Sequence, residues 1–161
     1  MAYIIEGRVW VFGHNINTDL MCPGVYQWGS WEDVRPHVLE AANPEFPKKV
    51  APGDIVVGGK NFGCGSSREK APRNLKNLGV SCIMAESFGR IFFRNCVAIG
   101  LPIMKCDGVS SQFQSGEQAR IDLEGGSVEN CTQRRTVIAE PLSAQIITTL
   151  REGGILSLLK K

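Results

Sequence analysis

Residues 61–72 of this 161-residue chain read NFGCGSSREKAP, and they combine two glycines, two adjacent hydroxyls and a guanidinium. Gly63 and Gly65 allow the backbone to turn through positive φ or to approach a ligand closely. The segment leads into a sequence that can become helical, and Pro72 suits the first turn of a helix. Unpaired backbone N–H groups at a helix start favour anions. The segment is therefore expected to form an anion-binding loop followed by a helix.

The side chains of this loop favour a carboxylate as the anion. Arg68 carries a planar guanidinium that can hold a carboxylate through two parallel hydrogen bonds. Ser66 and Ser67 add hydroxyl groups beside it, and one of them could also take part in chemistry. The spacing alone is equally compatible with an ordinary glycine- and serine-rich surface loop that exposes an arginine.

Length and composition indicate a single globular domain over residues 1–161, because 43% of the residues are apolar. The 18 Lys and Arg residues nearly balance the 16 Asp and Glu residues and are mostly scattered. This distribution predicts neither a nucleic-acid partner nor a membrane surface. No apolar run approaches the roughly 20 residues of a membrane span, and the first residues lack the features of a signal peptide. A cytoplasmic protein is expected.

Hydrophobic periodicity predicts an α/β protein in which strands and helices are interleaved. Strands are predicted over residues 3–12, 54–57, 80–85, 102–105, 119–123 and 136–139. Helices are predicted over residues 31–42, 71–78, 88–99 and 142–152, with Gly153-Gly154 as the stop signal of the last one.

The cysteines do not predict a metal site in this chain. There are six, at positions 22, 64, 82, 96, 106 and 131, and no two are spaced as C-x₂-C. Only His14 and His37 could complete a metal site. Reduced thiols are therefore expected, with Cys82 and Cys96 as small core residues.

Several further motifs flank the loop, and their order identifies a resemblance. They are NINTD at 15–19, PGD at 52–54, AESFGRIF at 85–92, Asn95 with GLP at 100–102, and Gly153-Gly154. Together with residues 59–72 they resemble the small subunit of 3-isopropylmalate dehydratase, the detached swivelling domain of the aconitase superfamily. The resemblance covers nearly the whole chain. It implies a layered β/β/α swivelling domain.

The resemblance also implies roles for individual residues. Ser66 would be the base that abstracts a proton as an alkoxide, while Ser67 and Arg68 would bind a substrate carboxylate beside Gly65. Asp19 matches an active-site carboxylate that pairs with groups on the facing domains. Without the resemblance, an Asx-type turn would be enough to explain Asp19.

The family's [4Fe–4S] cluster lies on a large subunit, so none is expected in this chain, which would be active only with that partner. Arg90 is a supporting residue that could reach the same site from a helix start, or hold the loop through hydrogen bonds to carbonyl groups.

Two departures from the family pattern concern the substrate. The family has Pro-Gly-Arg-Tyr-Leu-Arg where this chain has Pro23 and Gly24 followed by the specificity loop Val25, Tyr26, Gln27 and Trp28. The loss of both arginines disfavours a distal carboxylate on the substrate and favours an apolar or smaller group. Alternatively, Trp28 and Trp31 anchor the loop or form a subunit contact.

Lys70 is the second departure, because the family has histidine at this position. A flexible cation here could meet the large subunit, pair with Glu69 or reach the substrate. The sequence does not distinguish these three possibilities.

The sequence thus predicts the small subunit of an iron–sulfur hydro-lyase acting on a small di- or tricarboxylate. Isomerisation of 2- and 3-isopropylmalate in leucine biosynthesis is the leading interpretation. The alternatives are a related dehydratase of dimethylmalate, methylmalate or citraconate, maleate or homoaconitate type, and a non-catalytic relative that binds carboxylates.

Overall fold

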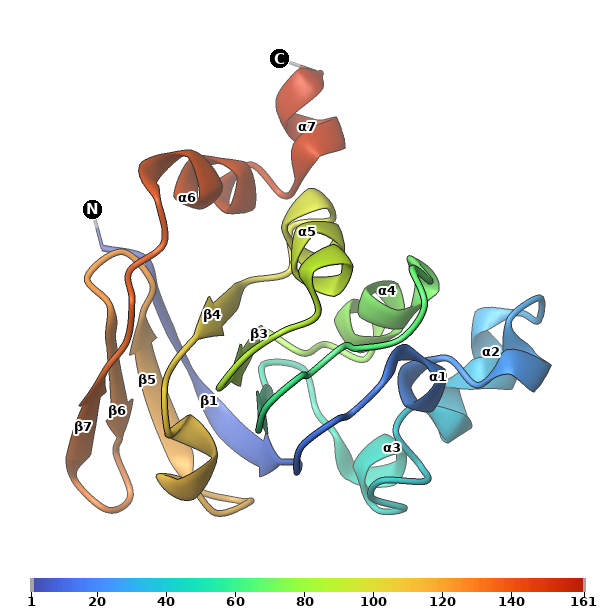
Figure 1. Ribbon diagram of the computed structural model, residues 1–161, viewed down its shortest axis with the longest axis horizontal. Helices are drawn as coiled ribbons and strands as arrows, with labels where there is room; N and C mark the ends of the chain where they lie inside the picture. The colour runs from blue at the N-terminus through green and yellow to red at the C-terminus, as the bar shows by residue number, and fades with distance from the viewer. Residues whose placement is uncertain (1, 161) are drawn as a thin grey trace.

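One seven-stranded mixed sheet forms the centre of the molecule in the computed structural model, which describes residues 2–160 (Figure 1). The spatial order of its strands is β4-β3-β2-β1-β5-β6-β7. The strands are β1 (Ile4–Val11), β2 (Ile55–Gly58), β3 (Cys82–Ala85), β4 (Ile103–Lys105), β5 (Gln118–Asp122), β6 (Ser127–Asn130) and β7 (Arg135–Ile138).

Strand β1 belongs to both halves of this sheet. Its last part pairs in parallel with β2, in the register Val9 with Ile55. Its first part pairs antiparallel with β5, in the register Ile4 with Asp122. Strands β1 to β4 are parallel to one another, whereas β5, β6 and β7 form an antiparallel meander. The carboxyl ends of β1 to β4 therefore lie along one edge of the sheet.

Within the described part of the chain, seven short helices connect or follow the strands. They are α1 (Thr18–Met21), α2 (Trp31–Val34), α3 (Phe46–Lys49), α4 (Lys70–Asn77), α5 (Arg90–Ala98), α6 (Ala144–Arg151) and α7 (Ile155–Leu159), with single 3₁₀ turns η1 (Gly24–Tyr26), η2 (Arg35–His37) and η3 (Val109–Ser111). None of the helices within residues 2–160 is long and apolar enough to cross a lipid bilayer.

Strands β2 and β3 are buried on both faces, which explains their continuous apolar sequences. Val56 and Ile83 face a core formed with α4, α5 and the segments around α1 to α3. Ile55 and Met84 face a second core, formed with the antiparallel strands and with Ile147 of α6. Side chains alternate between these two cores because successive residues of a strand point to opposite faces. The predicted layered β/β/α arrangement is confirmed.

The predicted helix over residues 31–42 is wrong in its extent. Helix α2 ends at Val34, a 3₁₀ turn follows, and Leu39 has a φ of +58°. Pro36 explains the break, because proline has no N–H group and its ring clashes with the carbonyl of residue i−4 inside a helix.

Six elements within residues 2–160 were not predicted: the short helices α1 and α3, the 3₁₀ turns η1 and η3, strand β6 and helix α7. Strand β6 contains one apolar residue, Val128, yet it pairs with β5 and β7 on its two sides. Helix α7 follows Gly153 and Gly154, which adopt φ values of +85° and +114° and separate it from α6. The glycines do stop α6, as predicted, but the chain then forms another helical turn.

Candidate active site

The candidate site forms where the chain leaves β1 and β2 at the carboxyl edge of the sheet. Beyond the strands, the Gly63 N–H donates to the Ile16 carbonyl at 2.7 Å, and the Thr18 N–H donates to the Cys64 carbonyl at 2.9 Å. These bonds hold the NINTD motif beside the glycine loop, as the blue and green segments next to α1 show (Figure 1). Ligands bind at this edge of open α/β sheets.

Both glycines of the loop have the predicted positive φ, +80° at Gly63 and +106° at Gly65. A Cβ atom at Gly63 would lie 2.2 Å from the Phe92 ring, so any side chain there would have to displace Phe92. A Cβ atom at Gly65 would lie 3.3 Å from the Thr18 hydroxyl. The glycines therefore permit both the turn and its close packing.

Ser66 lies beside a buried hydroxyl that the sequence analysis did not select. The Thr18 side chain is 2% exposed, and its hydroxyl lies 3.1 Å from Ser66 Oγ and 3.3 Å from the Ser66 carbonyl oxygen, to which it can donate. Thr18 lies in the NINTD motif at residues 15–19, and this motif is the only feature of the sequence that points to it. Its contact with Ser66 joins residues too distant in sequence for spacing to indicate.

Asp19 and Arg68 form an ion pair in which Arg68 Nη1 lies 2.7 Å from Asp19 Oδ1. The same Nη1 donates to the Cys22 carbonyl at 3.1 Å, and the Gly24 N–H donates to Asp19 Oδ1 at 3.0 Å. The hydrogen bond from Arg68 lowers the pKa of the Asp19 carboxyl below its ordinary value, with a smaller contribution from Gly24. The two predicted residues are therefore brought together.

The Asx-type role in this turn belongs to Asn17 rather than to Asp19. The Asn17 side chain caps α1 by accepting from the Leu20 N–H at 3.0 Å. The Asp19 side chain stays 64% exposed at the edge where the glycine loop ends. Ser66 and Ser67 are exposed at the same edge, and no hydrogen bond within residues 2–160 involves the Ser67 hydroxyl.

The predicted specificity loop, residues 25–28, lies next to the Asp19–Arg68 pair. Val25 and Trp28 are 87% and 85% exposed, whereas Tyr26 is half-buried and stacks on His37 with a centroid distance of 4.2 Å. Trp31, by contrast, is half-buried and packs against the core. The two tryptophans thus differ: Trp31 anchors the segment and Trp28 projects from it.

Lys70 contacts this loop and does not pair with Glu69. Its Nζ donates to the Gln27 carbonyl and lies 5.8 Å from the centroid of the Trp28 ring. Glu69 instead lies 3.7 Å from Arg73 Nε.

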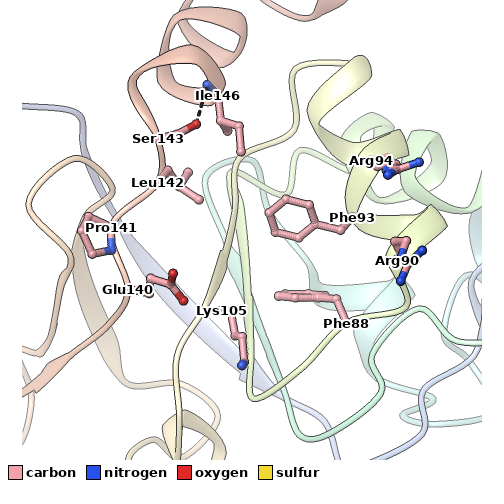
Figure 2. Close-up of a pocket in the computed structure, with 10 residues that line it drawn as sticks. All are labelled: Phe88, Arg90, Phe93, Arg94, Lys105, Glu140, Pro141, Leu142, Ser143 and Ile146. Atoms are coloured by element: carbon pink, nitrogen blue, oxygen red, sulfur yellow. Dashed lines mark hydrogen bonds between the residues drawn. The ribbon is translucent and has the colours of Figure 1, made fainter.

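Arg90 lies outside this group of residues. It lines a separate cavity of about 610 Å³ between α5 and the segment before α6. Figure 2 shows Phe88 and Phe93 on one side of this cavity and Leu142 and Ile146 on the other, with Arg90 at the α5 side. Within residues 2–160, Arg90 makes no hydrogen bond to the glycine loop. Of the two alternatives for Arg90, the described residues do not form the hydrogen bonds to loop carbonyl groups, and a supporting role from the helix start stays a prediction.

The cysteines of the chain do not fit a [4Fe–4S] cluster, which is held by several thiolates. Cys82, Cys96 and Cys106 are buried, and burial raises the pKa of each thiol, to about 11 for Cys106. Across residues 2–160, no three His, Cys, Asp or Glu side chains come together in a way that could hold a metal ion.

Comparison with known proteins extends over the whole chain. Residues 30–106 match the aconitase C-terminal domain. The isopropylmalate/citramalate isomerase small subunit of Methanocaldococcus jannaschii is 46% identical, over 100% of this chain and 96% of that protein. The methanogen homoaconitase small subunit of Methanothermobacter thermautotrophicus is 44% identical, over 98% of this chain and 91% of that protein.

A crystal structure of 3-isopropylmalate dehydratase from Methanocaldococcus jannaschii superposes with a TM-score of 0.91 at 34% identity, covering 98% of this chain and 94% of that one. Both relatives share more than 40% sequence identity with this chain over nearly its full length, and the crystal structure has the same fold. This chain belongs to the family of 3-isopropylmalate dehydratase small subunits, which share the aconitase C-terminal domain.

Proposed function

We propose that this chain is the small subunit of a hydro-lyase that interconverts 2- and 3-isopropylmalate by dehydration and rehydration. The observation that carries the proposal is the grouping of Ser66, Thr18, Arg68 and Asp19 at the carboxyl edge of β1 and β2. This edge presents a hydroxyl, a guanidinium and a carboxylate within one surface. Such a set can remove a proton from a substrate whose carboxylates are bound.

Ser66 is the proposed base. A serine alkoxide is costly at neutral pH unless hydrogen-bond donors and positive charge stabilise it. The Thr18 hydroxyl, 3.1 Å from Ser66 Oγ, can supply one such donor, and the positive end of α4 begins four residues later. Ser66 is exposed in this chain, so the water-poor surroundings that the alkoxide needs must come from a partner that covers the edge.

Arg68 is the proposed carboxylate ligand, with the Ser67 hydroxyl and the backbone at Gly65 beside it. Its Nη1 is occupied by Asp19 and the Cys22 carbonyl, so a substrate carboxylate would approach the remaining nitrogens. Asp19 fixes the guanidinium in place and remains ionised because Arg68 lowers its pKa. We assign Asp19 to orienting Arg68 and to contacts with the facing subunit.

The partner is proposed to be a cluster-binding large subunit, since the relatives are named as small subunits and the thiols of this chain do not fit a cluster. The chain alone is then expected to be inactive. We place the complex in the cytoplasm, without a nucleic-acid or membrane partner, and assign the whole chain to a single swivelling domain.

The substrate is proposed to carry an apolar substituent, because Val25 and Trp28 are exposed beside the candidate site and the loop has no cation of its own. A related malate with a smaller substituent is the second candidate. It is favoured by one relative that is named for both isopropylmalate and citramalate.

The proposal is tested by mixing the purified chain with its cluster-loaded large subunit without oxygen. Turnover of 2-isopropylmalate, citramalate, dimethylmalate, homocitrate and citrate is then measured side by side. The highest kcat/KM is expected for 2-isopropylmalate, and neither subunit should be active alone. A complex that forms but turns over none of these acids would overturn the catalytic proposal and favour a carboxylate-binding relative.

A further inference from the structure

We propose that Lys70 is a positioning residue that fixes the specificity loop and thereby sets which substituted malate is preferred. This inference rests on the proposed function. Lys70 is the first residue of α4, and its half-buried side chain extends away from Glu69 toward the loop. Its Nζ donates to the Gln27 carbonyl and lies over the Trp28 ring, 5.8 Å from the centroid. One ammonium thus holds both the backbone and the aromatic side chain at the end of the loop.

The start of the loop is held by the candidate site itself. The Gly24 N–H donates to Asp19 Oδ1 at 3.0 Å, and the same oxygen accepts from Arg68 at 2.7 Å. Arg68 and Lys70 are two residues apart, so the start of the loop is connected to this short stretch through Asp19 and the end of the loop directly through Lys70. The loop therefore keeps its position relative to the proposed carboxylate ligand.

Packing between the loop and α4 is incomplete, so the Lys70 contact has few substitutes. A cavity of about 160 Å³ lies between residues 22–34 and α4, and the Lys70 side chain forms part of its wall. Tyr26 is anchored separately by stacking on His37, while Val25 and Trp28 project into solvent. Without Lys70, residues 27 and 28 would lose their contacts with the helix, whereas Trp31 would still anchor the segment that follows.

The contact between Lys70 and the specificity loop is expected to affect substrate choice rather than proton transfer. Val25 and Trp28 form an exposed apolar surface. The distance between this surface and Arg68 decides how large an apolar substituent fits beside a carboxylate bound to Arg68. Lys70 points at the loop rather than at Ser66, so it is expected to act through Trp28. A family histidine at position 70 would be shorter and would carry fewer donors than lysine.

The first test uses the isolated full-length chain and does not depend on catalysis. Hydrogen exchange of the amides in residues 24–29 is compared between wild type and Lys70→Met. The matched control is Lys76→Met, because Lys76 lies in the same helix and its Nζ also donates to a backbone carbonyl, that of Ile99. We expect Lys70→Met to accelerate exchange in this segment by about tenfold, and Lys76→Met to leave it unchanged. Equal exchange in all three proteins would overturn the positioning role.

The second test uses the complex reconstituted with the large subunit and compares 2-isopropylmalate with citramalate. Lys70→Met is expected to reduce the preference for the larger substituent by about tenfold, mainly through KM, while kcat changes little. Lys70→Arg should restore most of the preference, and Lys76→Met should retain it. An unchanged preference, or an equal loss of kcat with both substrates, would overturn the inference.

The two tests separate failure of this inference from failure of the proposed function. If the wild-type complex turned over no substituted malate, the proposed function would fail, whereas the exchange experiment would still decide whether Lys70 holds the loop. If the wild-type complex were active and Lys70→Met changed neither exchange nor preference, only the role of Lys70 would be lost.

Discussion

Two arginine–aspartate pairs lie at opposite ends of the parallel strands and have different surroundings. Asp54 directly precedes β2, and its side chain is 7% exposed. It accepts from Arg8 Nη2 at 2.8 Å, from Trp10 Nε1 at 2.8 Å and from the Ala51 N–H at 2.9 Å. Asp19 follows β1 at the other edge, is 64% exposed, and accepts from Arg68 at 2.7 Å.

Similar ion-pair distances in the two pairs therefore do not indicate similar roles. Removing a buried carboxylate leaves its partners without an acceptor, which costs much of the stability of a domain. An exposed pair contributes little to stability because water screens it. The Asp54 cluster is therefore assigned to the fold, and the Asp19–Arg68 pair to the site.

The largest expected effect is the loss of activity when Ser66 of the candidate site is replaced. Ser66→Ala should reduce kcat of the reconstituted complex by about 10³-fold or more, because the proposed base is lost. The thermal unfolding midpoint and the assembly with the large subunit should stay at wild-type values, since the Ser66 side chain is exposed. Steady-state kinetics and calorimetry measure the two quantities. Turnover close to wild type would remove Ser66 from the mechanism.

The next largest expected effect is the loss of stability when the buried Asp54 is replaced. Asp54→Ala should lower the free energy of unfolding by about 3–5 kcal/mol, because Arg8, Trp10 and the Ala51 N–H lose their shared acceptor. Urea denaturation of the isolated chain measures it. Asp19→Ala is the matched variant and should change stability only slightly. Equal destabilisation by the two variants would break the distinction drawn here.

Thr18→Val tests the contact between the Thr18 and Ser66 hydroxyl groups. Valine matches threonine in shape but cannot donate to Ser66, so kcat should fall by about tenfold to a hundredfold. Thr149→Val is the control, since Thr149 is also buried and its hydroxyl donates to the Gln145 carbonyl in α6, far from Ser66 in the fold. The two variants should lose similar stability. A similar loss of kcat in both would show that Thr18 acts only through packing.

The smallest expected effect is the pH dependence of the Asp19–Arg68 pair. Because the hydrogen bond from Arg68 lowers the pKa of Asp19 in the folded chain, the pair stabilises the fold fully above the ordinary aspartate pKa of about 3.9. This contribution is lost as the pH falls through the lowered pKa. The difference in unfolding free energy between wild type and Asp19→Asn should therefore be constant from about pH 7 to pH 5 and shrink below about pH 4. A difference that shrinks between pH 5 and pH 7 instead would contradict this assignment.

Sequence patterns predicted those parts of the fold in which local signals and tertiary contacts agree. The apolar runs of β2 and β3 and the helices α4 and α5 were found because burial on both faces, or on one helical stripe, leaves a periodic pattern. Strand β6 was missed because its pairing with two neighbours determines its conformation, and only Val128 contributes an apolar side chain.

The candidate site was predictable as a set of motifs but not as a set of contacts. Arg68 was selected from its chemistry in the glycine loop and Asp19 through the family resemblance, yet nothing in the spacing indicated that they pair with each other. Thr18 was overlooked because its role depends on Ser66, and Lys70 was left undecided because its partners lie in the loop at residues 27–28. Contacts between segments far apart in sequence leave no periodicity to detect.

The double pairing of β1 has a consequence for how the chain is made. This strand is translated before the other strands, but its antiparallel partner β5 spans Gln118–Asp122, in the last third of the sequence, and its parallel partner begins at Ile55. The edge of β1 that pairs with β5 therefore stays unpaired until most of the protein has left the ribosome. Such an edge invites wrong pairing with other nascent chains. We expect chaperone dependence and aggregation during synthesis to increase when translation slows between β2 and β5, although the finished fold is unchanged.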